Sequence, residues 1–134
     1  MSSVELIRSP SLTDAAPYAY AAVVPAGRTV YTAGACPLDD TGAVVAPGDV
    51  AAQAQCVMEN LVVALAAASA GLADVAKSTV YVASSDRDDL VAAWDVVRAA
   101  FGEHDAPSTL LGVAMLGYPD QLVEVEAVAV LPAG

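Results

Sequence analysis

The stretch Leu122-Val123-Glu124-Val125-Glu126-Ala127-Val128-Ala129-Val130 has a two-residue period. Its odd-numbered positions are all apolar, which predicts a strand with one face against a core, because successive strand side chains point to opposite faces. Its even-numbered positions combine Glu124 and Glu126 with apolar residues. Two carboxylates on an otherwise apolar face lose hydration unless that face meets water, a partner or a ligand. Two interpretations stay open: a solvated sheet edge, or a glutamate that lines a pocket and orients water or a polar ligand.

Two amphipathic segments lie upstream of this strand. Apolar side chains recur at intervals of three and four from Asp49 onward, which predicts a helix capped by Asp49 and ended by Gly71. The Ser85–Asp88 sequence resembles a capping box and predicts the start of a second helix, which Gly102 closes. Between the two helices, Val75–Ala83 is rich in Val, Thr and Tyr, which favours a strand.

The remaining strands are predicted from other apolar stretches. These are Val4–Arg8, Tyr18–Val24, Thr29–Gly34, Thr109–Leu116 and Leu122–Leu131. Pro25–Arg28 indicates a hairpin turn, Gly117–Asp120 joins the last two strands, and Pro37–Gly48 is loop-like. The predicted order is β-β-β-α-β-α-β-β, with helix-linked strands parallel and the terminal hairpins antiparallel. The fold class is therefore α+β, a mixed sheet with both helices on one face and the other face bare.

Composition supports one domain, over residues 1–134, that buries surface against other subunits. Hydrophobic residues make up 57% of the chain, and so small a protein with a bare apolar sheet face favours association. Five basic and 16 acidic residues give a net charge of −11, which argues against binding to nucleic acid or to anionic membranes.

The sequence also indicates where the protein works. The most apolar run, Leu61–Ala68, is too short to span a membrane, and Met1–Leu12 has no secretory apolar core. Cys36 and Cys56 form neither a disulfide framework nor a metal-binding motif. A cytoplasmic protein with reduced thiols is expected.

A few single residues are candidates for chemistry, each with a structural alternative. Cys36 follows a predicted strand end and could act as a nucleophile, although packing is favoured because no nearby base or cation lowers its pKa. Trp94 lies on the apolar stripe of the second helix and packs in the core or walls a ligand cleft. Tyr18 and Tyr20 offer phenol donors or pack half-buried. His104, the sole histidine, follows a helix-ending glycine and is interpreted as a surface loop residue. No nucleophile elbow accompanies it, which argues against a catalytic triad.

Taken in order, several segments resemble the Rid family, also called the YjgF family, of reactive-intermediate deaminase-like proteins. They span Tyr18 to Val130 and are Ala16-Pro17-Tyr18, Thr32-Ala33-Gly34-Ala35-Cys36-Pro37-Leu38, Thr41-Gly42, Gln53-Ala54-Gln55 with Glu59-Asn60-Leu61, Asp74–Val82, Phe101-Gly102-Glu103-His104 and Val123–Ala129. The resemblance implies a chorismate-mutase-like α+β subunit that forms a homotrimer. The three sheets would face inward as a barrel, with small-molecule clefts at the subunit interfaces.

The resemblance also implies an activity and its residues. Well-studied members hydrolyse reactive enamines and imines, such as 2-aminoacrylate, with no metal or organic cofactor. Tyr18 and Glu124 match the family's tyrosine and water-orienting glutamate, so they are the expected catalytic residues. The expected substrate-binding residues are Gly34, Cys36, Trp94, Pro107 and Thr109.

The chain departs from the family pattern at the expected cleft. Pro107 occupies the position of the arginine that binds the substrate carboxylate, and proline offers neither charge nor side-chain donor. Trp94 replaces a common asparagine, Ala33 a common serine, and the loop Met115–Gln121 is longer than usual. These changes predict a more apolar cleft with no remaining Lys or Arg in it.

Two functions are compatible with this sequence. The first is cofactor-free hydrolysis or deamination of an imine, enamine or related electrophile, without efficient 2-aminoacrylate deamination. The alternative is a non-catalytic protein that binds an apolar small metabolite between Trp94 and Tyr18. RNA cleavage, a label sometimes attached to this family, is disfavoured by the net charge of −11.

Overall fold

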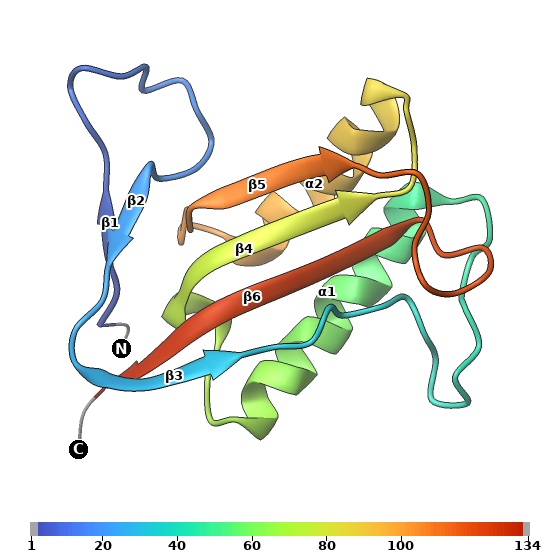
Figure 1. Cartoon of the computed structure of the whole chain (residues 1–134), viewed down its shortest axis with the longest axis horizontal. Coiled ribbons are helices and arrows are strands. Elements are labelled where there is room, and N and C mark those ends of the chain that lie inside the picture. Colours follow the sequence, from blue (N-terminus) through green and yellow to red (C-terminus); the bar gives the residue numbers. More distant parts are fainter. Residues whose placement is uncertain (1–2, 133–134) are drawn as a thin grey trace.

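A four-stranded mixed sheet with both helices packed behind it forms the body of the protein in the computed structural model, which describes residues 3–132 (Figure 1). The elements are β1 (Glu5–Ile7), β2 (Ala21–Val23), β3 (Gly27–Tyr31), α1 (Val50–Ala67), the 3-10 turn η1 (Leu72–Asp74), β4 (Val75–Val82), α2 (Arg87–Phe101), β5 (Ser108–Gly112) and β6 (Val123–Pro132). The predicted α+β class is confirmed. The two residues at each end of the predicted domain lie outside the described part of the chain.

The last strand lies inside the sheet, whose order is β3-β6-β4-β5. Strand β6 pairs antiparallel with both β3 and β4, and β4 pairs parallel with β5 across the α2 connection. The parallel pair joined by the second helix is therefore as predicted. The strands joined by α1 are not neighbours, because β6 lies between β3 and β4.

Both predicted terminal hairpins are wrong. Strand β2 pairs with β1 in a separate two-stranded sheet, whereas β3 pairs with β6, so that Thr29 lies opposite Val130. At the other end, β5 and β6 both bond to β4, which separates them. The physical reason is that β4 and β6 offer long ladders with a buried face, and these long-range pairings override the local turn signals.

The core lies between the sheet and the helices, and it confirms the two-residue period of β6. Val123 and Val125 have no exposed surface, and Ala127 is 3% exposed. The first helix contributes five apolar side chains that are at most 1% exposed to the same core, namely Ala54, Val57, Met58, Leu61 and Leu65. By length and composition alone α1 is apolar enough to cross a membrane. Its place in the core accounts for that apolar character.

The first helix begins as predicted but ends earlier. The Asp49 side chain accepts a hydrogen bond from the backbone N–H of Ala52 at 3.0 Å, which confirms the cap. The helix ends at Ala67 rather than at Gly71. The chain leaves the helix there because Ser69 adopts a left-handed φ of 65°, the conformation predicted for the glycine.

The second helix also shows one correct and one incorrect end. Its N-cap is Asp86, whose side chain accepts from the Asp88 backbone N–H at 2.9 Å, rather than Ser85. The Ser84 hydroxyl accepts from the Asp86 N–H and fixes this turn one residue further along. Gly102 ends the helix with a φ of 64°, as predicted.

Candidate functional site

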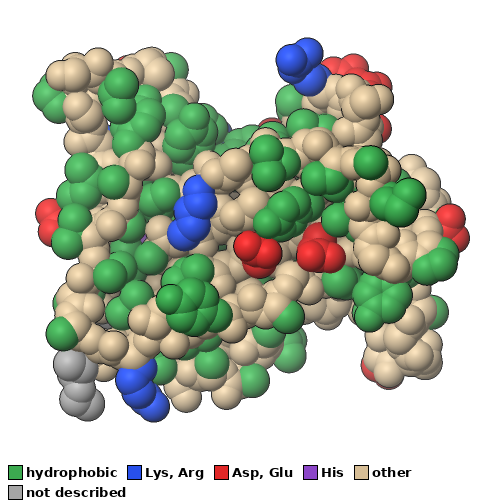
Figure 2. Space-filling model, in the orientation of Figure 1, with side chains coloured by type: hydrophobic (Ala, Val, Ile, Leu, Met, Phe, Trp, Pro, Cys, Tyr) green, Lys and Arg blue, Asp and Glu red, His purple; other side chains and the backbone are tan. Residues whose placement is uncertain are grey.

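The sheet face turned away from the helices carries the polar residues of interest. Figure 2 shows acidic and basic side chains side by side among apolar ones on this face. The strand registers place Tyr81 opposite Glu124, and Thr79 opposite both Glu126 and Thr109. Tyr31 is 78% exposed on the same face. This open face therefore combines a carboxylate pair with uncovered apolar surface.

Glu124 is the centre of a polar cluster at one end of β6. Its Oε1 accepts hydrogen bonds from the Cys36 thiol at 3.4 Å and from the Gln121 amide at 3.1 Å. A Cβ added at Gly34 would lie 2.7 Å from the Glu124 Cγ and closer still to its carboxylate, so only glycine fits there. The structure thus brings together Gly34, Cys36 and Glu124, three of the predicted site residues.

The loop between β5 and β6 is anchored by buried amides. Gln53 is fully buried on α1, donates to the Asp120 carbonyl at 2.9 Å and accepts from the Leu122 N–H at 2.8 Å. Gln121 is 4% exposed and accepts from the Tyr118 N–H at 3.1 Å. Sequence reasoning missed Gln121, because nothing in its local pattern showed that it reaches Glu124.

Cys36 is held as a thiol. Burial is the main cause that raises its pKa, followed by the hydrogen bond to Glu124 and the charge of that carboxylate. A protonated thiol donates to the carboxylate and is a weak nucleophile. The geometry therefore favours a positioning role for Cys36 over covalent catalysis.

The pKa of Tyr81 is raised by burial and by the two carboxylates of the open face. Burial raises the pKa of its phenol, and the charge and hydrogen bond of Glu126 and the charge of Glu124 add to the effect. The phenol therefore remains a neutral donor toward the carboxylates across the physiological pH range.

A second group of predicted residues surrounds a cavity at the outer strand of the sheet. Tyr18 and Trp94 meet edge to face with ring centroids 6.4 Å apart. Together with Ser108, Thr109 and Leu110 they line a cavity of about 400 Å³. Trp94 is half-buried, so it walls this cavity and also packs against the core. One cluster, which we call the aromatic cleft, thus contains Tyr18, Trp94 and Thr109. Glu124 belongs to the separate polar cluster with Gly34 and Cys36.

The segment that carries Tyr18 is tied to the loop before β5. The Ala19 N–H donates to the Asp105 carbonyl at 2.8 Å, and Arg8 forms a salt bridge with the Asp105 carboxylate at 3.0 Å. These contacts hold Tyr18 against Trp94, although no sequence pattern links residues so far apart.

Pro107 is buried directly before β5. Its carbonyl accepts a hydrogen bond from the Ser78 N–H of β4 at 3.0 Å. Among the described residues that line the aromatic cleft there is no Lys or Arg, as predicted, but one lysine lies beside it. Lys77 extends over the open face and its Nζ donates to the Thr109 hydroxyl at 2.6 Å. Lys77 and Thr109 share a face because their neighbours Ser78 and Ser108 are paired in register on the core side.

Other features lie apart from both clusters. The His104 ring nitrogen Nε2 is 2.7 Å from the Val75 carbonyl oxygen, and the ring stacks on Phe101, so this histidine stabilises the fold rather than lying free on the surface.

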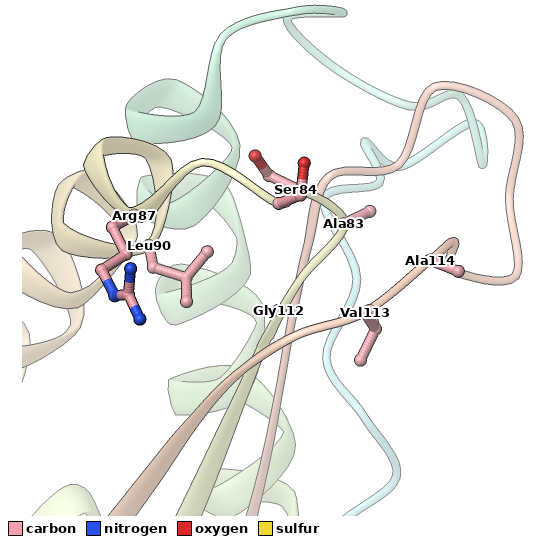
Figure 3. Close-up of a pocket in the computed structure, with 8 residues that line it drawn as sticks. Ala83, Ser84, Arg87, Leu90, Gly112, Val113 and Ala114 are labelled. Atoms are coloured by element: carbon pink, nitrogen blue, oxygen red, sulfur yellow. The ribbon is translucent and has the colours of Figure 1, made fainter.

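A larger cavity of about 780 Å³ lies beside Arg87, Leu90 and Gly112 (Figure 3). Within residues 3–132, no three His, Cys, Asp or Glu side chains are grouped to hold a metal ion.

The fold is an α+β subunit with a mixed sheet and both helices on one face, and comparison with known proteins gives its family. The family model described as Endoribonuclease L-PSP matches residues 11–131. The chain therefore belongs to the YjgF/Rid family.

Relatives and solved structures agree with this membership. The 2-iminobutanoate/2-iminopropanoate deaminase of Salmonella typhimurium is 37% identical over 125 residues, which cover 88% of this chain and 94% of that protein. The crystal structure of the Rid-family protein YyfB from Yersinia pestis has a TM-score of 0.90 at 30% identity and covers 96% of this chain and 99% of its own. Escherichia coli TdcF, solved with bound serine, has a TM-score of 0.67 at 32% identity, with coverages of 87% and 90%.

Proposed function

We propose that this protein hydrolyses an imine, enamine or related electrophile, without a cofactor, at a cleft that contains Glu124. The observation that carries the proposal is the geometry of that carboxylate. Cys36 and Gln121 both donate to Oε1, which holds the group in one orientation on an open face. Support comes from the relative named for 2-iminobutanoate and 2-iminopropanoate deamination, at 37% identity.

The arrangement suits general-base catalysis on water. The absence of a side chain at position 34 lets the Glu124 carboxylate lie directly against the backbone there, which fixes the base in place. Water adds to the carbon of the protonated imine while Glu124 takes one of the water protons, which gives a neutral carbinolamine. Glu124 returns that proton to the nitrogen. The carbinolamine hydroxyl then gives its proton to Glu124 as the C–N bond breaks, its electron pair leaves with the nitrogen, and ammonia and a carbonyl compound are released. Water and imine thus account for every atom of the products.

We further propose that the active form is a homotrimer in which the open faces meet and the clefts lie between subunits. Exposed apolar residues support this assembly, since Tyr31 is 78% and Leu111 43% exposed. Light scattering at assay concentrations should give three times the subunit mass of 13.4 kDa. A stable monomer with full activity would contradict this part of the proposal.

Substrate preference should differ from that of the family's well-studied members. Pro107 has no charge with which to clamp a carboxylate in two places, so 2-aminoacrylate should be a poor substrate. The test couples an amino-acid oxidase to semicarbazide and measures how far the protein depletes the imine before it is trapped. Little depletion with small imino acids, and turnover with a bulkier imine, is the expected result. Rapid depletion of the smallest imino acids would show the preference to be wrong.

A specific observation favours one alternative, a non-catalytic protein that binds an apolar metabolite. The aromatic cleft offers about 400 Å³ between the rings of Tyr18 and Trp94. Tight binding with no turnover of any imine would favour this alternative. RNA cleavage, the activity in the family model's description, is disfavoured because a chain of net charge −11 is poorly suited to bind RNA.

A further inference from the structure

One cation lies at the edge of the aromatic cleft. Lys77 is an exposed residue of β4 whose Nζ donates to Thr109 Oγ1 at 2.6 Å. Thr109 also lines the cavity beside Tyr18 and Trp94. The Thr109 hydroxyl is therefore shared between the ammonium group and the cavity wall.

The charge of Lys77 has no carboxylate partner within the described chain. Among residues 3–132 the structure contains one salt bridge, and it joins Arg8 to Asp105. An ammonium group has three N–H donors, and the structure shows one of those of Lys77 bonded, to Thr109. Donors thus remain for an external acceptor. The protein carries a net charge of −11, so an unpaired cation at a cleft has a strong local influence on which ligands approach.

The strand register strengthens the link between Lys77 and the cleft. Ser78 pairs with Ser108 on the neighbouring parallel strand, which places Lys77 level with Pro107. Pro107 is buried and presents no donor. Where Lys77 and Pro107 lie level on the paired strands β4 and β5, the charge is therefore that of Lys77. The Lys77 and Thr109 side chains lie on the same face of the sheet.

We propose that Lys77 is a specificity-determining residue, which binds an anionic group, a carboxylate, of the ligand in the aromatic cleft. The inference concerns the aromatic cleft, which is separate in the subunit from the Glu124 cluster, so it does not rest on the proposed hydrolysis. Lysine is a single point charge rather than a planar fork, so it binds a carboxylate without fixing its plane. The hydrogen bond to Thr109 restrains the ammonium group and so partly fixes the direction from which it contacts the carboxylate.

The consequence is a ligand preference of a particular kind. Carboxylates should bind more tightly than neutral analogues of the same shape, and added salt should reduce the difference. A guanidinium group in place of the ammonium group should bind the carboxylate with similar affinity, because charge is what the contact requires.

The test measures binding rather than turnover, on the protein as purified. Calorimetric or NMR titration with 2-oxobutanoate is compared with titration by the neutral 2-oxobutanamide. Lys77→Met should raise the Kd for the acid about tenfold or more, the loss expected for a charge-assisted contact, and leave that for the amide unchanged. Lys77→Arg should stay within about threefold of the wild type. Arg28→Gln, which removes an exposed cation on β3 at the opposite edge of the sheet, is the matched control and should bind like the wild type.

Two results would overturn the inference: a Lys77→Met variant that binds the acid within about twofold of the wild type, or one that loses acid and amide equally. The second result would show that Lys77 only supports the fold. The outcomes also separate the two proposals. Imine turnover with Lys77-independent binding defeats the role of Lys77 alone, and Lys77-dependent acid binding without turnover defeats the hydrolase alone.

Discussion

Glu124→Gln is expected to lower the rate of imine hydrolysis by about two to four powers of ten, the range for loss of a general base. The amide keeps the size of the side chain and can still meet Cys36 and Gln121. It cannot accept the proton of the attacking water. The effect should fall on kcat, with KM nearly unchanged, because substrate contacts are preserved. Steady-state rates with an imine that the wild type consumes provide the measurement.

Glu126→Gln is the matched control for this substitution. Glu126 lies on the same face of β6, two residues further along. It lies opposite Thr79, whereas Glu124 lies against the backbone of Gly34. It has the same charge, so a general electrostatic effect of the open face would appear in both variants. We expect its rate to stay within about threefold of the wild type. A loss confined to Glu126→Gln would transfer the catalytic role to that residue, and equal losses would exclude a specific base.

Gln53→Leu is expected to reduce the free energy of unfolding by about 3 kcal/mol, since each buried partner left without a hydrogen bond costs about 1–3 kcal/mol. The Gln53 side chain is fully buried and bonds to the carbonyls of Ala46 and Asp120 and to the N–H of Leu122. Leucine preserves most of the volume but none of these bonds. Urea denaturation gives the free energy, provided that the slope with denaturant is unchanged.

Gln55→Leu serves as the comparison for Gln53→Leu. Gln55 is exposed on the same helix, and its amide donates only to Glu59 at 3.3 Å. Its loss should change the free energy of unfolding by no more than about 0.5 kcal/mol. Similar small values for both variants would show that the anchored loop between β5 and β6 does not contribute to global stability.

Local periodicity predicted the elements that bury one face. The alternation in β6 and the three- and four-residue spacing in α1 follow directly from which side chains contact the core. Pairing between distant strands has no comparable signal. Thr29 meets Val130 across most of the chain, so the hairpins suggested by local turns were wrong. Strand pairing depends on which of several alternative ladders is the most stable, and a single sequence does not show their relative stabilities.

The candidate site was predictable to a similar degree. Glu124 was recognisable as a carboxylate on an apolar strand, and its link to Gly34 followed from the family resemblance. Gln121 and Lys77 were missed, since each acts through a contact to a different strand or loop. Such contacts depend on register, and a one-residue slip would turn Lys77 toward the core.

The position of β6 in the middle of the sheet also affects how the chain folds as it is made. Its ladders to β3 and β4 cannot form until residues 123–132 have been synthesised, although α1, β4 and α2 are available earlier. Until then both β3 and the inner edge of β4 lack their partner, and apolar strand edges in that state are prone to aggregate. The sheet should therefore be completed only after β6 has been made, and chaperones that cover exposed strands would have their main influence in the period before β6 docks.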